Sequence, residues 1–198
     1  MNDQEIAFWA ELVNKGTTKA MNNLSQMLGQ EIKVTSFGLK QIPVTETSQL
    51  MGGPEVEAIG IYLTVSGSAD GHIMLMYDPQ MAYGFVDLLM DQPEGTTQAL
   101  GEMESSALGE LGNIMGSSFL NALAEATGLT LMPSPPNVMT DMAGALLDVI
   151  AADILQTQDD AFVAEATYQA PGRNISGLFF VIPTQNLLQA LLATRIAA

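Results

Sequence analysis

The sequence predicts a single α+β domain in which an antiparallel sheet packs against two long helices. Three observations lead to this prediction. Two long segments that each end at a glycine have the apolar periodicity of helices. Two pairs of short apolar runs lie on either side of turn residues, as in β-hairpins. These elements occur in the same order in both halves of the chain, whose 198 residues and 47% apolar content suffice for a substantial core.

The first half is expected to form a helix, a strand, a hairpin and a helix. Asp3 is the candidate N-cap of the first helix, and Gly29 is its candidate C-terminal stop. The hairpin is expected around the turn SGSADG, and the last helix follows the dipeptide Asp78-Pro79. The expected elements are the helix 3–28, an extended segment 31–36, the hairpin strands 58–65 and 72–77, and the helix 80–90.

The second half is expected to repeat this order. The expected elements are the helix 102–127, a strand 129–132, a helix 139–154, the hairpin strands 161–168 and 177–182, and the helix 184–194. We therefore expect one domain over residues 1–198, built from two helix-strand-hairpin-helix halves, 1–95 and 100–198, around a pseudo-twofold axis. Each half would cover the exposed sheet edge or apolar face of the other.

Polar residues of the helix 102–127 are expected to line up on its exposed face. Ser106, Glu110 and Asn113 stand at i, i+4 and i+7, and Ser117 extends the row. Apolar residues recur at three- and four-residue steps on the opposite side, which is typical of a helix packed on a core. These residues are Leu108, Leu111, Met115, Phe119 and Ala122. Pro136 lies beyond Asn113, with twenty-two residues between them.

A second, incomplete copy of this pattern lies near the N-terminus. A shift of 99 residues places Glu11 on Glu110 and Asn14 on Asn113. The same shift aligns three further identical pairs, which are Asn22 with Asn121, Leu24 with Leu123 and Gly29 with Gly128. These matches predict an internal repeat. The copy departs from the pattern at Ala7, in place of Ser106, and at Phe37, in place of Pro136.

The pattern S-x3-E-x2-N, followed by the distant proline, resembles the motif of the CheC/CheX/FliY phosphatases. This family removes the phosphoryl group from the response regulator CheY in chemotaxis. Two motif copies in about 200 residues resemble CheC more than CheX, which has one copy. FliY would need an extra C-terminal domain, which we do not expect here. The resemblance implies an antiparallel sheet packed against two long helices that carry the motifs.

The resemblance also implies roles for individual residues. Asn113 and Asn14 would orient a water molecule in line with the P–O bond of an aspartyl phosphate, while Glu110 and Glu11 would pair with a lysine of the response regulator. Ser106 and Pro136 would support this motif. The chain itself would need no cofactor and no metal, because Mg²⁺ is expected on the phosphorylated receiver.

Other interpretations of these residues remain open. A Glu three residues before an Asn is common on exposed helices, and the chain could be a non-catalytic binding module for CheD or a receiver domain, or a partner of the flagellar switch. Lys15 directly follows Asn14 and would either hold an anionic partner or be solvated. Gly109, Gly112 and Gly116 weaken their helix and would let a partner's backbone come close.

The helix expected over residues 139–154 presents Asp141 and Asp148 at i and i+7, which we interpret as a solvated face. In the CheC family CheD binds and stimulates the phosphatase, so the resemblance makes this helix a candidate contact for CheD.

Composition excludes several classes of partner and chemistry. Six basic residues against 22 acidic ones give a formal charge of −16, which would repel nucleic acid and anionic lipid. The chain has no cysteine and a single histidine, His72, so thiolate chemistry and a histidine metal cluster are not expected. No signal peptide and no membrane-spanning stretch are expected. We expect a cytoplasmic monomer in which the methionines mostly fill the core.

Overall fold

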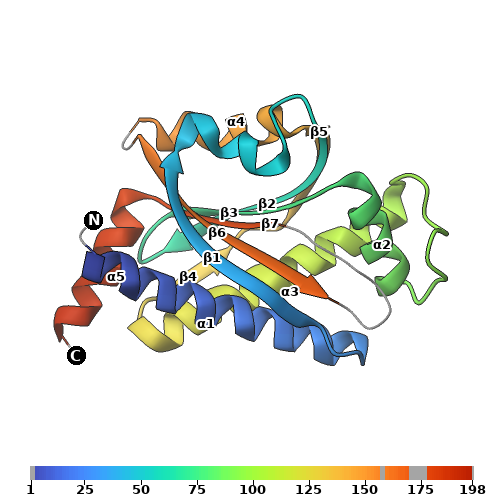
Figure 1. The fold of residues 1–198 in the computed structure, drawn as a ribbon. Helices are drawn as coiled ribbons and strands as arrows, with labels where there is room; N and C mark the ends of the chain where they lie inside the picture. Colours follow the sequence, from blue (N-terminus) through green and yellow to red (C-terminus); the bar gives the residue numbers. More distant parts are fainter. Residues whose placement is uncertain (1–2, 157–158, 170–177, 198) are drawn as a thin grey trace.

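The strands lie in the middle of the molecule, between a layer of long helices and a layer made of one α-helix and one short 3₁₀ helix (Figure 1). The computed structural model describes residues 3–156, 159–169 and 178–197. The long helices α1 (Asp3–Leu28) and α3 (Glu102–Thr127) cover one face, and α4 (Ala143–Ile154) with the 3₁₀ helix η1 (Val44–Met51) covers the other. The expected α+β class is confirmed.

Helices α1 and α3 have the bounds that the sequence predicts. Both are followed by a glycine with positive φ, Gly29 at 62° and Gly128 at 73°, a conformation that ends a helix without strain only at glycine. Asp3, the expected N-cap, is itself helical, so its predicted role is wrong. The two helices run in opposite directions across each other, as Figure 1 shows. Asn23 Nδ2 donates to Ser118 Oγ at 2.8 Å across this contact.

Seven strands lie within the described residues, and the pairings between them there are all antiparallel. They are β1 (Lys33–Pro43), β2 (Glu57–Gly67), β3 (Gly71–Tyr77), β4 (Leu131–Pro133), β5 (Asn137–Met142), β6 (Asp160–Gln169) and β7 (Leu178–Pro183). The expected first hairpin is confirmed, because β2 pairs with β3, with Ile61 opposite Leu75. In the second half, β6 pairs with β1 in a two-stranded sheet, and β7 pairs with β3 in a five-stranded sheet that also contains β2, β4 and β5. Strands β6 and β7 contact each other. The turn expected between them, at 170–174, lies outside the described residues.

Strand pairing crosses between the two halves of the chain. Strand β1 of the first half pairs with β6 of the second, and β5 of the second half pairs with β2 of the first. The exchange is reciprocal, as a pseudo-twofold arrangement requires. Two expectations stay predictions: that residues 1–95 and 100–198 are repeats of each other, and that the chain forms a single domain.

The helix expected over residues 139–154 is wrong in its first part. Residues 137–142 form β5, which pairs with β2 so that Thr140 lies opposite Ile59, and α4 begins only at Ala143. Backbone pairing with β2 overrides the helical pattern there. Asp141 and Asp148 are both exposed, but they lie on different elements and do not share a helix face. The remaining helices are α2 (Pro79–Leu89), which Asp78 caps, and α5 (Gln185–Ala197).

Apolar side chains pack on both faces of the sheet. The larger cluster joins α1 and α3 to the sheet through residues such as Trp9, Phe119 and Ile61. The smaller cluster joins α4 to the other face through residues such as Leu146 and Met74. Each fully buried large side chain stabilises the fold by roughly 1.5–3 kcal/mol. The sequence predicted the packing of the long helices on one face but not the second apolar cluster on the other face. None of the described helices is long and apolar enough to cross a bilayer.

Candidate functional site

Helix α3 has one buried face and one exposed face, as its sequence predicts. Leu108, Leu111, Met115 and Phe119 are completely buried, and Ala122 is nearly so. Ser106, Glu110 and Asn113 are exposed, and Ser117 is half-buried. The burial on one side fixes the rotation of the helix, so it also decides which polar side chains face solvent.

The exposed face of α3 forms one wall of a groove, which we call the α3 groove. Its other wall is the segment 133–138, which leads from β4 to β5. The groove has a volume of about 750 Å³. Its lining residues are Glu102, Ser105, Ser106, Gly109, Glu110, Asn113, Pro133, Ser134, Pro135, Pro136 and Val138. The structure therefore brings all four residues of the predicted motif together, although Pro136 is distant in sequence.

Two glycines let α3 lie close against this wall and the sheet. A Cβ atom at Gly112 would be 2.4 Å from Ile61 Cγ2 and 3.3 Å from Pro136 Cβ, and one at Gly116 would be 3.0 Å from Leu63 Cδ2. Both glycines are buried against the chain's own strand β2. The expectation that they admit a partner's backbone is therefore wrong. Gly109 differs, since it lines the groove and a Cβ there would be 4.0 Å from its nearest neighbour, Val138.

The position of the α3 N-terminus is set by the connector that precedes it. Glu104 Oε2 accepts a hydrogen bond from the Gly101 N–H at 2.9 Å. The fully buried Asp87 of α2 accepts backbone N–H bonds from Gly95, Thr96 and Thr97 at 2.7, 3.1 and 2.8 Å. Burial alone would raise the pKa of Asp87, but these bonds, with one from the Thr97 side chain, hold that pKa below its ordinary value. The ionised carboxylate therefore ties the connector to α2.

Asn113 has a hydroxyl neighbour one turn along the helix. Ser117 Oγ donates to Asn113 Oδ1 at 3.4 Å, a long hydrogen bond that restricts the amide without occupying both lone pairs of its oxygen. The amide thus keeps capacity to accept from, and donate to, a group in the groove.

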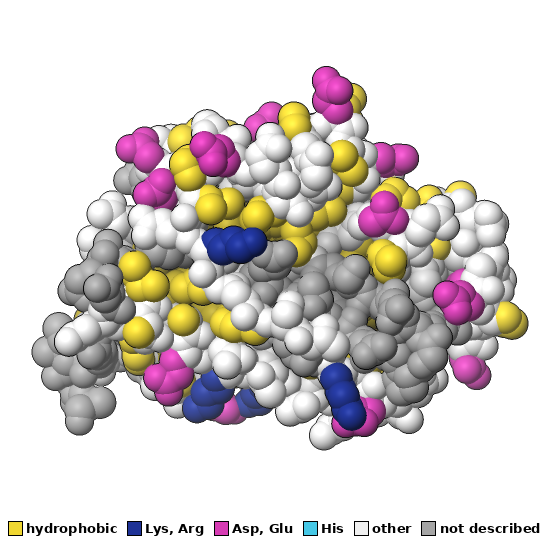
Figure 2. Space-filling view, viewed as in Figure 1, with side chains coloured by type: hydrophobic (Ala, Val, Ile, Leu, Met, Phe, Trp, Pro, Cys, Tyr) yellow, Lys and Arg dark blue, Asp and Glu magenta, His cyan; other side chains and the backbone are white. Residues whose placement is uncertain are grey.

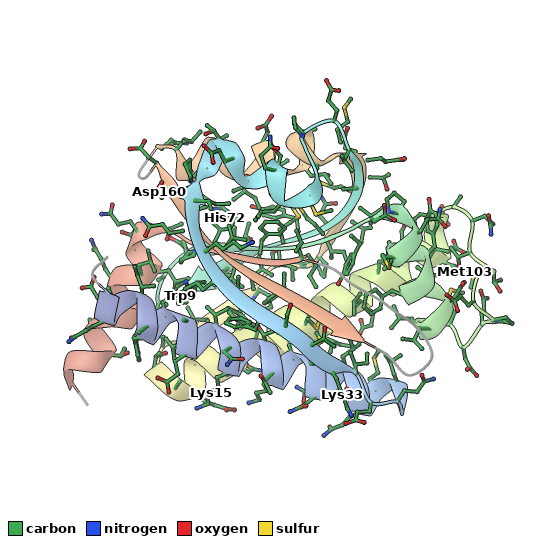
Figure 3. All side chains as sticks on the ribbon, in the orientation of Figure 1. Trp9, Lys15, Lys33, His72, Met103 and Asp160 are labelled. Carbon is green, nitrogen blue, oxygen red and sulfur yellow. The ribbon has the colours of Figure 1, made fainter. Side chains whose placement is uncertain are left out.

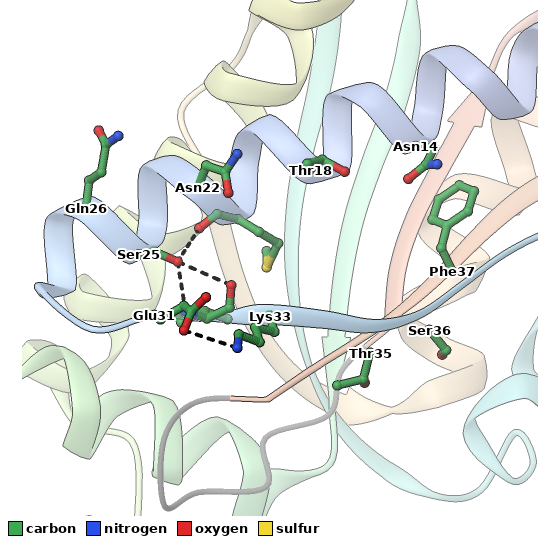
Figure 4. A pocket seen from close by; sticks show the side chains of 12 residues that line it. Asn14, Thr18, Asn22, Ser25, Gln26, Glu31, Lys33, Thr35, Ser36 and Phe37 are labelled. Carbon is green, nitrogen blue, oxygen red and sulfur yellow. Dashed lines mark hydrogen bonds and ion pairs between the residues drawn. The ribbon is translucent and has the colours of Figure 1, made fainter.

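A second groove, which we call the α1 groove, lies between α1 and the start of β1 (Figure 4). It has a volume of about 780 Å³. Figure 4 shows the ring of Phe37 pointing from β1 toward Asn14. Glu11 is exposed on α1 but is not among the lining residues, and Ala7 is exposed at the position that corresponds to Ser106. The structure thus places Asn14 beside Phe37 and leaves Glu11 at the margin. The other lining residues are Thr18, Met21, Asn22, Ser25, Gln26, Glu31, Ile32, Lys33, Thr35 and Ser36.

His72 lies away from both grooves, within the sheet. Its Nδ1 is 2.9 Å from the Tyr62 hydroxyl, and its side chain is buried. In the ranges 3–156, 159–169 and 178–197, no cluster of three or more histidine or carboxylate side chains could hold a metal ion.

Comparison with known proteins adds to this geometry. A family model described as the CheC-like family matches residues 103–140, which include all of α3 except its first residue and also include Pro136. The CheY-P phosphatase CheC of Bacillus subtilis is 28% identical over 195 residues, which cover 96% of this chain and 93% of that protein. These matches support membership of the chain in the CheC/CheX/FliY family.

Solved structures of the CheC/CheX/FliY family share the fold. The crystal structure of Thermotoga maritima FliY has a TM-score of 0.75 and 22% identity, covering 100% of this chain and 98% of that chain. CheX in the Borrelia burgdorferi complex of CheX, CheY, BeF₃ and Mg²⁺ has a TM-score of 0.54 and 18% identity, covering 88% and 97%. At these identities the likeness establishes the common architecture.

Ser134 also lines the α3 groove, but it is not part of the motif and was not predicted from the sequence. Its N–H donates to Thr64 O at 2.9 Å, and its hydroxyl accepts from Thr64 N at 3.0 Å. These two bonds fasten the segment that carries Pro136 to β2. The run PSPP could have indicated this role, because among its four residues only Ser134 has a backbone N–H to donate.

Proposed function

We propose that this protein is a phosphatase that accelerates hydrolysis of the aspartyl phosphate on CheY or a CheY-like response regulator. The α3 groove is the observation that carries this proposal, since it gathers Ser106, Glu110, Asn113 and Pro136 at an exposed face. The chain resembles, over almost its whole length, a relative named as a CheY-P phosphatase, and another family member, CheX, is known in complex with CheY.

The chemistry requires little from the phosphatase itself. An aspartyl phosphate is already a reactive acyl phosphate, and the Mg²⁺ of the receiver neutralises charge on it. The remaining need is a water molecule held in line with the P–O bond. The amide of Asn113 suits this task, because its oxygen accepts from water without adding negative charge beside the phosphoryl group. Ser117 restricts that amide from within the same helix.

Glu110 is the proposed docking residue. It is exposed one helical turn before Asn113, and both residues line the same groove. A carboxylate there would form a charge-assisted bond with the lysine beside the phosphorylation site of the receiver, which would fix how deeply Asn113 inserts. Ser106 and Pro136 act as supporting residues, and Pro136 does so by packing against α3 at Gly112.

Asn14 and Glu11 form a proposed second site on α1. Both are exposed, but the α1 groove lacks a serine at position 7 and a proline at position 37. We therefore propose that this site acts more weakly than the α3 site. The chain itself is proposed to bring no cofactor, and the metal of the reaction belongs to the receiver.

The alternative is a binding module that holds CheD or a receiver domain without hydrolysing anything. One observation favours a protein partner at a different face. Met142, Val149 and Leu155, on β5 and around α4, expose between 47% and 52% of their surface, although they are large and apolar. CheD would be a partner for this face.

The proposal is tested by the decay of acyl phosphate on a Mg²⁺-loaded receiver from the same organism. Wild-type protein should accelerate the decay, and Asn113→Ala should lose most of the acceleration. Asn121→Ala is a matched control, because Asn121 is exposed on the same helix but does not line the groove. Binding of the receiver without any acceleration would support the alternative instead.

A further inference from the structure

A lysine stands beside the proposed docking glutamate of α1 and has no counterpart on α3. Lys15 is four residues after Glu11, and both side chains are exposed. The corresponding pair on α3 is Glu110 and the half-buried Ile114, and the sequence of α3 contains no basic residue. Side chains at i and i+4 lie on the same helix face, and glutamate before lysine is the favourable order.

The neighbourhood of Lys15 leaves its ammonium group available. The nearby carboxylate of Glu125 on α3 is bound by Lys19, with Nζ and Oε1 2.6 Å apart. The hydrogen bond and charge of Lys19 lower the pKa of Glu125, and the charge of Lys15 makes a smaller contribution in the same direction. Within the described part of the chain, no hydrogen bond or ion pair joins Lys15 to another group.

The linings of the two grooves also differ in charge, and again the basic side chain is on the α1 side. The α3 groove is lined by two carboxylates, Glu102 and Glu110, and by no basic side chain. The α1 groove is lined by Glu31 and Lys33, whose Oε2 and Nζ atoms are 3.2 Å apart, so its lining has no net charge. Figure 3 shows Lys15 on α1 and Lys33 at the start of β1 along the same lower side of the molecule, while acidic side chains are widespread on the face in Figure 2.

We propose that Lys15 is an internal competitor for Glu11, which weakens docking of the receiver's lysine at the α1 site and makes the two sites unequal. This inference rests on the proposed function. When Lys15 turns toward Glu11 it occupies the carboxylate that the receiver needs, and its charge also repels the receiver's lysine. Lys15 is a positioning residue, because it acts through Glu11 and touches no reacting atom. It should therefore change KM and leave kcat unchanged.

The test isolates the α1 site by silencing the other. In the Glu110→Ala/Asn113→Ala background, Lys15→Gln should lower KM for the phosphorylated receiver by about two- to fivefold at low ionic strength. Lys15→Ile, which copies α3, should do the same. Lys15→Arg should retain the parental KM because it keeps the charge. The difference should shrink as salt is raised to about 0.5 M. Lys15 is exposed, so these variants are not expected to disturb folding.

A reciprocal change provides the second arm. In the Glu11→Ala/Asn14→Ala background, Ile114→Lys should raise KM at the α3 site, and its melting temperature shows whether the half-buried position tolerates lysine. An unchanged KM in Lys15→Gln, or a raised one showing that Lys15 attracts the receiver, would overturn the inference.

Binding separates this inference from the proposed function. Affinity for a receiver loaded with Mg²⁺ and BeF₃⁻, which stands in for the phosphoryl group, should rise by the same factor in Lys15→Gln. If wild-type protein accelerated no hydrolysis, the proposed function would fail, while this binding measurement would still decide whether Lys15 competes for Glu11.

Discussion

The α1 and α3 grooves differ less in their helices than in the walls opposite them. Both helices are 26 residues long, end at a glycine in the left-handed conformation, and expose a Glu and an Asn three residues apart. Opposite α3 is a proline-rich turn that Ser134 fastens to β2. Opposite α1 is the beginning of the long strand β1, where Phe37 replaces the proline. The proposed α3 site therefore has a facing wall that the proposed α1 site lacks.

The largest expected effect separates the two asparagines. Asn113→Ala should lower the accelerated rate of acyl phosphate loss by about 100-fold, because the attacking water loses its orientation. Asn14→Ala should lower it by less than about twofold, since the α1 site contributes the smaller share in this proposal. Single-turnover decay with each variant measures this. Equal losses would show that Ala7 and Phe37 do not weaken the α1 site.

Helix packing in the α3 groove predicts the next effect. Gly112→Ala should reduce the free energy of unfolding by about 2 kcal/mol, because its Cβ would be 2.4 Å from Ile61 Cγ2. Gly109→Ala is the matched control and should be neutral or stabilising, since its nearest neighbour would be 4.0 Å away. Denaturant unfolding of the two variants measures the difference. If both variants had the same stability, the close contact of α3 with β2 at Gly112 would not explain why glycine is needed there.

Docking is expected to separate the two glutamates. Glu110→Ala should raise KM for the receiver by about tenfold, the loss of one charge-assisted bond of roughly 1.4 kcal/mol, with a smaller change in kcat. Glu11→Ala should alter KM little while the α3 site is intact. Steady-state kinetics with the receiver in excess provide both constants. A lower kcat at unchanged KM would instead indicate that Glu110 acts on the reacting atoms.

The smallest expected effect concerns the connector that leads into α3, which Asp87 of α2 holds through three backbone N–H bonds. Asp87→Asn should cost about 1 kcal/mol of unfolding free energy at neutral pH, because the amide keeps one oxygen for the backbone N–H groups but loses the charge. The folded-state pKa of Asp87 is lowered, so its contribution is present above its ordinary pKa and is lost as pH falls through the folded value.

Unfolding of both proteins followed from pH 7 to acid pH would check this. The stability difference between wild type and Asp87→Asn should narrow as the pH falls. A difference that stayed constant, or grew, would contradict the ionised state of Asp87 in the fold.

The sequence predicted the two long helices and the exposed motif because these depend on local information. The spacing of Leu108, Leu111 and Met115 determines which face of α3 is buried, and Gly29 and Gly128 mark where the long helices end. The first hairpin was predicted for the same reason. The motif residues Glu110 and Asn113 were correctly expected on the exposed face.

The rest depended on contacts between distant segments. Residues 137–142 became a strand because β2 offers them a pairing edge, which no local pattern reveals. The burial of Gly112 and Gly116 follows from how closely α3 approaches Ile61 and Leu63. The second apolar layer beneath α4 and η1 was likewise not predicted. The segment 133–138 faces α3 only because distant parts of the chain pack together, so the sequence alone did not predict this wall of the α3 groove. For α1, the only sign in the sequence that such a wall is missing was Phe37, which stands at the position of Pro136.

The central claim is that the two asparagines supply the catalysis and that Asn113 supplies most of it. The most direct measurement is the rate of acyl phosphate loss from a saturating Mg²⁺-loaded receiver with wild-type protein and with the Asn14→Ala/Asn113→Ala variant. The predicted result is a clear acceleration by the wild type and the receiver's own rate with the double variant. An acceleration that survives in the folded double variant would contradict the claim, because other groups would then orient the water.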